Sequence, residues 1–182
     1  MRHSKVGSMK SMALTTIALI AGFSTALRAD TEAAEAQLVD PAGSAIGRAT
    51  FEQAPAGVLM YVEVEGLAPG AHGIHLHAVG ACAPDFSAAG GHINPGGAAH
   101  GLRNPEGPDN GDLPLLYAGA DGSARAEFFT PRVTISGGPA PPLLDEDGSA
   151  VIIHAHPDDH QSQPIGGAGG RVGCGVIAAS SD

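Results

Sequence analysis

The histidines are the residues of this sequence that are best suited to do chemistry. His75 and His77 stand two residues apart in GIHLHAVG, and on a β-strand both imidazoles would point to the same face. His92 in GGHINP and His154 in VIIHAH come from distant segments. Imidazoles that meet from separate segments bind copper or zinc well. A lone HxH pair is weak evidence, since most histidines lie on the surface or are satisfied core residues.

The stretch that follows His92 supplies further metal-ligand types. His100, Asp109 and Asp112 all lie there, before the next apolar run begins. Zinc accepts both imidazole nitrogen and carboxylate oxygen. Together with the four histidines above, these residues indicate a metal site much more strongly than the HxH pair does alone.

Cys82 and Cys174 are the only cysteines of the chain. In an oxidising compartment a single pair usually forms one disulfide. The alternative is a pair of thiolate metal ligands, which is weaker because the histidines already fill a site. We therefore expect a disulfide.

The amino-terminal segment has the layout of a secretory leader. Arg2, Lys5 and Lys10 precede an uncharged stretch over residues 11–27, and small residues follow it. We expect a leader over residues 1–29 and one domain over 30–182, with a cut as late as Ala36 left open. A membrane anchor is the weaker alternative, because the stretch contains Thr, Gly and Ser and falls short of the ~20 apolar residues that a span needs.

Removal of this leader would leave a strongly acidic protein. Five arginines and no lysine follow residue 29, against nineteen Asp and Glu, so the net charge would be −14. Such a charge argues against nucleic acid and anionic membranes as partners. It is also an unusual surface for an enzyme that acts on an anion.

The elements that must position these residues are predicted to be strands. Glycine and proline are abundant, with 27 and 14 residues, and both interrupt helices. Val62 and Val64 alternate with Glu63 and Glu65, which is the period of a half-buried strand. The predicted strand segments are 34–40, 45–53, 58–67, 72–80, 115–130 with a turn at 121–122, and 149–156.

This spacing predicts an all-β fold, a sandwich or barrel with Greek-key connections. Two long stretches, 81–111 and 157–170, have no strand character. Long ordered loops in a compact domain are usually functional, and these two hold most of the unusual residues.

Five separated motifs, taken together, resemble those of a known family. GIHLHAVGAC, GGHINP, HGLRNPEGPDNGDLP, HAHPDD and GGRVGCGVI occur in this order. They are similar to motifs of the copper,zinc superoxide dismutases, especially the secreted bacterial members with GDLP in the zinc loop. The resemblance covers residues 34–179 and implies an eight-stranded Greek-key β-barrel. It also implies that the protein is located in the bacterial periplasm or outside the cell.

The resemblance also implies roles for individual residues. His92 would bridge two metals, and Asp158 would hydrogen-bond ligands of both. Cys82 and Cys174 would form the family disulfide, and Arg171 would guide and hold superoxide. The copper ligands would be His75, His77, His92 and His154, and the zinc ligands His92, His100, Asp109 and Asp112.

The implied reaction is the dismutation of superoxide in a ping-pong cycle. One superoxide reduces Cu(II) and leaves as dioxygen. A second reoxidises the copper and leaves as hydrogen peroxide, with His92 as one proton donor. Zinc would hold the bridging ring in place and tune its basicity.

One position departs from the family pattern. Nine residues after His100, where the family has a zinc-binding histidine, this sequence has Asp109. We expect Asp109 still to bind zinc, because zinc accepts carboxylate oxygen. The alternative is a degraded site with water or Asn110 nearby.

Other interpretations remain open at this point. A non-catalytic copper-binding or copper-delivery relative would share every ligand, and Asp109 is the feature that favours it. A zinc hydrolase that uses His75, His77 and His154 would have no use for a bridging His92. The sequence leaves a monomer and a homodimer equally open. We expect the remaining histidines, His3, His72, His156 and His160, to lie in turns or on the surface.

Overall fold

The computed structural model describes residues 32–180, together with Met1 and His3. The expected leader over 1–29 lies outside the described residues, apart from those two positions. The described elements are nine strands and one short 3₁₀ helix. They are β1 (Ala33–Val39), β2 (Ala45–Ala54), β3 (Gly57–Val64), β4 (Gly70–His72), β5 (Ile74–His77), η1 (Phe86–Ala89), β6 (Leu116–Ala118), β7 (Ala124–Thr130), β8 (Ser149–His154) and β9 (Arg171–Ala179).

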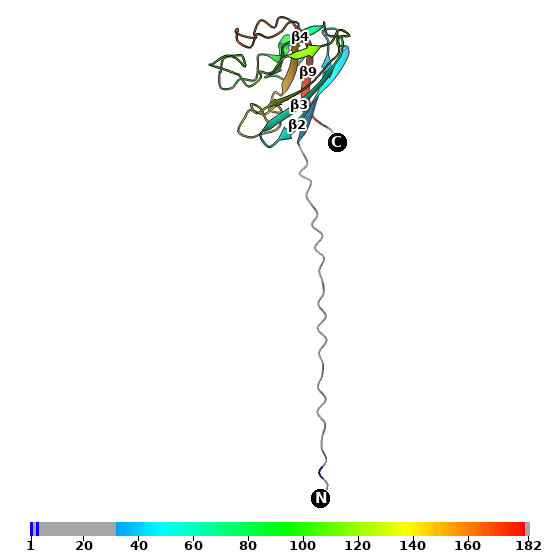
Figure 1. Ribbon diagram of the computed structural model, residues 1–182, viewed down its shortest axis with the longest axis vertical. Coiled ribbons are helices and arrows are strands. Elements are labelled where there is room, and N and C mark those ends of the chain that lie inside the picture. The colour runs from blue at the N-terminus through cyan, green and yellow to red at the C-terminus, as the bar shows by residue number, and fades with distance from the viewer. Residues whose placement is uncertain (2, 4–31, 181–182) are drawn as a thin grey trace.

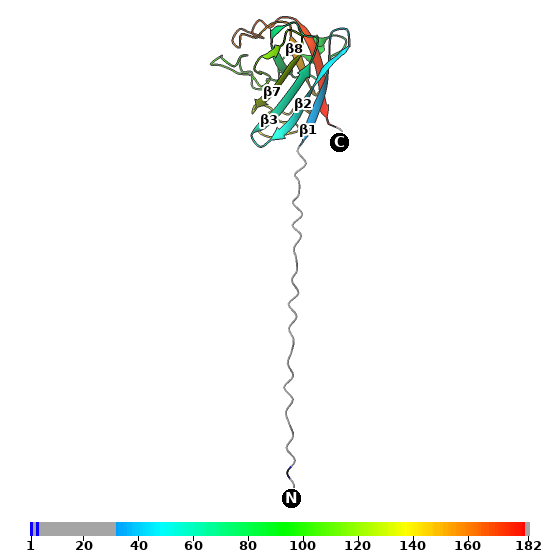
Figure 2. The same ribbon diagram turned by 45° about the vertical axis from the view of Figure 1, so that its right-hand side comes forward.

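The strands form a curled antiparallel sheet (Figures 1 and 2). Its strand order is β5-β8-β9-β1-β2-β3-β7, and β4 pairs with β6 in a second, two-stranded sheet. Strand β1 pairs with both β2 and β9, so the two ends of the domain lie side by side. The predicted all-β Greek-key barrel is confirmed, with nine strands described where the family resemblance implied eight.

The core lies inside the curl of the sheet. Along β3, Val58, Met60 and Val62 are buried, while the intervening Tyr61 is exposed, as the period of two predicts. Strand β8 differs, because all of its residues are buried. Its outer side is covered by a second small apolar cluster that includes Cys174 and the partly buried Phe86. The histidine at the end of β8 is therefore carried by a fully buried strand.

The predicted strand–turn–strand unit over 115–130 is only partly correct. The turn exists, because Gly119 N–H donates to the carbonyl of Ser123 at 2.8 Å and Gly122 adopts a φ of 80°. However, β6 pairs with β4 and β7 pairs with β3. The two strands therefore continue into different sheets, since each finds a longer-range partner.

The two predicted loops connect β5 to β6 and β8 to β9, and apart from η1 they contain no strand or helix. A disulfide joins Cys82 of the first loop to Cys174 of β9, with the two Cα atoms 5.9 Å apart. The expected disulfide is thus confirmed, and the cysteines are not metal ligands. No helix within residues 32–180 is long and apolar enough to cross a membrane.

Candidate metal centre

Two neighbouring strands carry three of the predicted ligands. His75 and His77 lie on β5, which pairs antiparallel with β8, the strand that ends at His154. The backbone N–H of His154 donates to the carbonyl of Gly73 at 2.8 Å, which brings the end of β8 next to the start of β5. All three side chains are buried, and each has a ligand nitrogen within 4.8 Å of the others.

The first loop brings His92 to this group. An isolated antiparallel bridge pairs His92 with His77, and Ile93 N–H donates to the carbonyl of Leu76 at 3.0 Å. The His92 ring centroid lies 4.3 Å from that of His75 and 5.0 Å from that of His77. The four histidines from distant parts of the chain therefore form one cluster.

In each of the three strand histidines, one ring nitrogen is hydrogen-bonded. His75 Nε2 donates to Asp158 Oδ2 at 2.9 Å, and His77 Nδ1 donates to the carbonyl of Gly90 at 2.9 Å. His154 Nδ1 donates to the carbonyl of Gly169 at 3.0 Å. These bonds orient the rings and select the tautomer that leaves the opposite nitrogen with a lone pair.

The other nitrogen of each of these three rings, and Nε2 of His92, are buried and have no hydrogen-bond partner. They are His75 Nδ1, His77 Nε2, His92 Nε2 and His154 Nε2. A buried polar atom without a partner destabilises the fold, and a bound metal ion removes that cost. Imidazole suits both oxidation states of copper, so this donor set fits a copper ion.

A second donor set lies on the Nδ1 side of the His92 ring. His92 Nδ1 lies 2.9 Å from Asp109 Oδ2 and 3.6 Å from Asp112 Oδ1. His100 Nδ1 lies 2.6 Å from the same Asp112 oxygen. The four residues offer ligand atoms within 4.8 Å of one another. Two imidazoles and two carboxylates form a donor set that zinc accepts.

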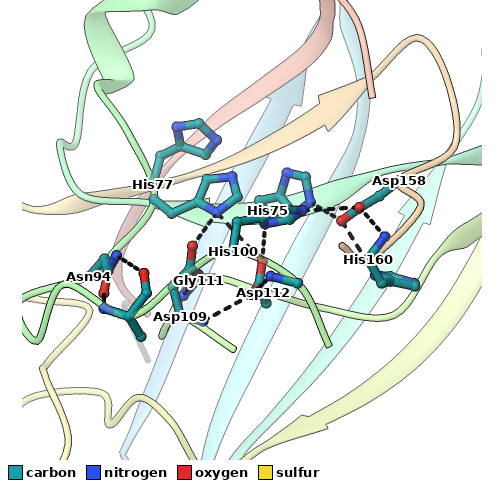
Figure 3. A network of polar contacts seen from close by, with 12 residues as sticks. His75, His77, Asn94, His100, Asp109, Gly111, Asp112, Asp158 and His160 are labelled. Atoms are coloured by element: carbon teal, nitrogen blue, oxygen red, sulfur yellow. Dashed lines mark hydrogen bonds and ion pairs between the residues drawn. The ribbon is translucent and has the colours of Figure 1, made fainter. Parts of the chain in front are cut away.

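Asp158 connects the two donor sets. We call the set of four histidines the copper side and the set that contains His100, Asp109 and Asp112 the zinc side. Its Oδ2 faces His75 Nε2 at 2.9 Å, and its Oδ1 faces His100 Nε2 at 3.1 Å (Figure 3). Each of these histidines directs its other nitrogen, Nδ1, towards a ligand position. One carboxylate therefore orients one ring on the copper side and one ring on the zinc side.

The two sides differ in their proton affinity. Burial lowers the pKa of His77 to about 2 and that of His154 to about 4, so both rings are neutral. Burial also opposes charge on His100, but its hydrogen bonds with Asp112 and Asp158 outweigh this and raise its pKa to about 10. Against the same effect of burial, His92 has a raised pKa because of Asp109 and Asp112. In the metal-free protein, the rings of His92 and His100 therefore hold a proton more strongly than those of His77 and His154.

Arg171 lies beside the copper side, at the start of β9. Its Nη2 donates to the carbonyl of Gly90 at 2.6 Å, and its Nη1 donates to the carbonyl of Phe86. The carbonyl of Gly90 also accepts from His77 Nδ1. The guanidinium and the His77 ring are thus held by a common backbone oxygen.

Sequence reasoning missed several residues that support the centre. His72 is buried, with its ring nitrogens 2.7 Å from the carbonyls of His154 and Ala68, so the expectation of a turn or surface position was wrong. His160 is also buried, and its N–H donates to Asp158 Oδ1 at 2.6 Å. Gln163 bonds the backbone of His100. No spacing pattern marks such residues, because their contacts arise from the fold. His156 is exposed, as expected.

Comparison with known proteins agrees with this arrangement. A family model described as copper/zinc superoxide dismutase matches residues 45–177. The copper-zinc superoxide dismutase of Caulobacter vibrioides is 51% identical over 74% of this chain and 79% of its own length. The crystal structure of a superoxide dismutase-like protein from Bacillus subtilis has a TM-score of 0.74 at 39% identity, covering 78% of this chain and 96% of that one.

A further solved structure, the copper/zinc superoxide dismutase from Brucella abortus, has a TM-score of 0.66 at 33% identity. It covers 81% of this chain and 100% of its own. The matched family region contains every predicted metal ligand, Arg171 and both cysteines. Copper and zinc are the metals of that family, in agreement with the two donor sets. The chain belongs to the copper/zinc superoxide dismutase family.

Proposed function

We propose that this protein dismutes superoxide to dioxygen and hydrogen peroxide in a ping-pong Cu(II)/Cu(I) cycle. The observation that carries the proposal is the set of four buried imidazole nitrogens without hydrogen-bond partners. One of them is Nε2 of His92, whose ring also belongs to the second donor set, of two histidines and two aspartates. Two superoxide ions and two protons give one dioxygen and one hydrogen peroxide, so the reaction needs a one-electron redox centre and a proton donor.

The proposed ligands divide between the two donor sets. His75 through Nδ1, and His77, His92 and His154 through Nε2, would hold copper. His92 and His100 through Nδ1, and Asp109 and Asp112 through carboxylate oxygens, would hold zinc. Bound copper would supply the one-electron redox centre, and bound zinc would polarise the shared ring of His92.

His92 would act as a proton donor in the reaction. Its Nε2 faces the copper-side histidines, while its Nδ1 faces Asp109 and Asp112. Nδ1 is thus held on the zinc side, and Nε2 is the atom at which the ring would carry and deliver a proton. A ring already held at the reacting centre suits general acid catalysis, because the proton transfer needs no large rearrangement.

Arg171 would bind the substrate anion. Two backbone carbonyls hold its guanidinium in place, and residues 32–180 contain only four other arginines and no lysine. A fixed cation beside the metal would concentrate a small anion locally, even on a negatively charged protein. The attraction would therefore be short-ranged.

The test is a dismutation assay on the purified protein with its copper and zinc contents measured in the same preparation. We expect activity that disappears when copper is removed by a chelator and returns when copper is added back. As a matched control, His156→Ala alters an exposed histidine and should keep full activity, whereas His154→Ala should lose copper. Stoichiometric copper without dismutation would refute the proposed reaction.

A non-catalytic copper-binding or copper-delivery protein is the second candidate. Two observations favour it, namely Asp109 in place of the family histidine and the likeness to the superoxide dismutase-like protein from Bacillus subtilis. The assay above separates the two candidates, because a delivery protein would bind copper, transfer it to an acceptor and show no turnover of superoxide.

We also propose that the protein is exported to the bacterial periplasm or secreted after loss of residues 1–29. The disulfide between Cys82 and Cys174 supports an oxidising compartment. Fractionation of cells and the intact mass of the recovered protein test this. A cytoplasmic protein that retains Met1 would contradict the export proposal.

A further inference from the structure

Gln163, in the loop between β8 and β9, forms two reciprocal hydrogen bonds with the backbone of His100. Its Oε1 accepts from the His100 N–H at 3.0 Å, and its Nε2 donates to the His100 carbonyl at 2.9 Å. His100 lies in the other long loop and is itself buried, although Gln163 is exposed as a residue. One amide side chain therefore holds both backbone polar groups of a single residue across two loops. We call this pair of hydrogen bonds between Gln163 and His100 the clasp.

The backbones around this clasp also approach closely. Arg103 N–H donates to the carbonyl of His160 at 3.0 Å. A Cβ atom added to Gly101 would lie 2.2 Å from the same carbonyl oxygen, so only glycine fits between the loops at this point. The contact between the loops is thus centred on His100 and its neighbours.

We propose that Gln163 is a positioning residue that sets how tightly the zinc site holds its ion. This inference rests on the proposed role of His100 as a zinc ligand. The His100 ring is already oriented by Asp158 and Asp112, but the loop that carries it contains no regular element over these residues. The clasp fixes the backbone from which the ring extends, and with it the place of Nδ1.

The physical reason is that a ligand on an irregular loop loses conformational freedom when it binds an ion. Hydrogen bonds that hold the ligand in its binding position before the ion arrives reduce that loss. Outer partners of metal ligands typically change metal affinity by about 10–100-fold when they are removed. Because Gln163 is exposed and water can replace part of its bonding, we expect the lower end of that range.

The test uses Gln163→Met, which keeps the length of the side chain and removes both hydrogen bonds to His100, together with a third from Nε2 to the carbonyl of Gln161 in the same loop at 3.1 Å. The matched control is Gln161→Met, an exposed glutamine of the same loop whose side chain has no hydrogen bond within the described residues. Zinc affinity and dissociation rate are measured by chelator competition, and Co²⁺ in the zinc site reports ligand geometry by its visible spectrum. We expect Gln163→Met to bind zinc about tenfold more weakly, with an altered Co²⁺ spectrum and unchanged copper affinity.

A double variant separates positioning from general stabilisation. In the background of His100→Ala, Gln163→Met should cause no further loss of zinc affinity, because the residue through which it acts is absent. Equal zinc affinity of Gln163→Met and Gln161→Met would overturn the inference, as would equal losses at the copper and zinc sites. If His100→Ala alone left zinc binding unchanged, the proposed zinc site itself would fail, which is a different result.

Discussion

His92 Nδ1 lies 2.9 Å from Asp109 Oδ2, in a cluster where the family pattern has a histidine instead of the aspartate. The carboxylate is buried, and its other oxygen accepts from Gly111 N–H at 2.9 Å. The shorter side chain therefore reaches the His92 ring in spite of the replacement. A zinc site with two carboxylates would carry more negative charge beside His92 than one with a single carboxylate.

The first prediction concerns Asp109 itself. Asp109→Ala should weaken zinc binding by at least about tenfold, because a removed ligand leaves an open position on the ion. Zinc titration in competition with a chelator measures this. Asn110→Ala is the control, since the Asn110 amide donates to the carbonyl of Arg132 at 2.7 Å. Unchanged affinity of Asp109→Ala would remove this residue from the zinc ligands.

The second prediction concerns Arg171. Arg171→Ala should lower kcat/KM by about 10–1,000-fold, the range over which electrostatic focusing changes association rates. Stopped-flow decay of superoxide measures this, with copper content checked in parallel. Arg125→Ala removes an exposed arginine that pairs with Glu63 and should have little effect. A rate unaffected by Arg171→Ala would contradict the proposed substrate contact.

The third prediction concerns the disulfide. The bond closes a long loop, since Cys82 and Cys174 are 92 residues apart. The Cys82→Ala, Cys174→Ala double variant should lower the free energy of unfolding by about 2–5 kcal/mol. Urea denaturation of the metal-free protein measures the difference, and reduction of the unaltered protein should reproduce most of it. Equal stability of the oxidised and reduced forms would show that the bond contributes nothing to the fold.

The fourth prediction concerns the pH dependence of zinc binding. With its pKa raised to about 10, His100 is protonated at neutral pH in the metal-free protein, and zinc must displace the proton from Nδ1. Zinc affinity should therefore increase about tenfold for each unit by which the pH is raised, up to about pH 10. Calorimetry in buffers of different ionisation enthalpy should detect the released proton. Zinc binding without proton release at pH 7 would contradict the raised pKa.

The same raised pKa has a consequence for the metal-free fold. His100 contributes stability in full below its ordinary pKa of 6.5, and this contribution is lost as the pH rises through about 10. Denaturation midpoints of the metal-free protein between pH 7 and 10 should therefore fall less in His100→Gln than in the unaltered chain. Parallel curves for the two proteins would show that His100 is not charged in this range.

A large part of the fold and of the candidate site could be predicted from the sequence. Alternation of apolar and polar residues located most strands, because the side-chain period of a strand is a local property. The proposed ligand set followed from the resemblance of five ordered motifs to the family, since the HxH pair alone is weak evidence for a metal site. The two cysteines had one partner each, so their pairing was also determined.

Tertiary structure alone decided which of these residues meet and what supports them. The partner of β6 is β4 and not the neighbouring β7, because strand pairing is settled by long-range packing. His72, His160 and Gln163 show no pattern in the sequence, since each acts through a backbone or carboxylate group far away along the chain. The sequence by itself determined the donor types and the strand or loop segments that carry them. Only the folded chain decided which nitrogen of each ring stays free, because that depends on the hydrogen bond made by the other nitrogen.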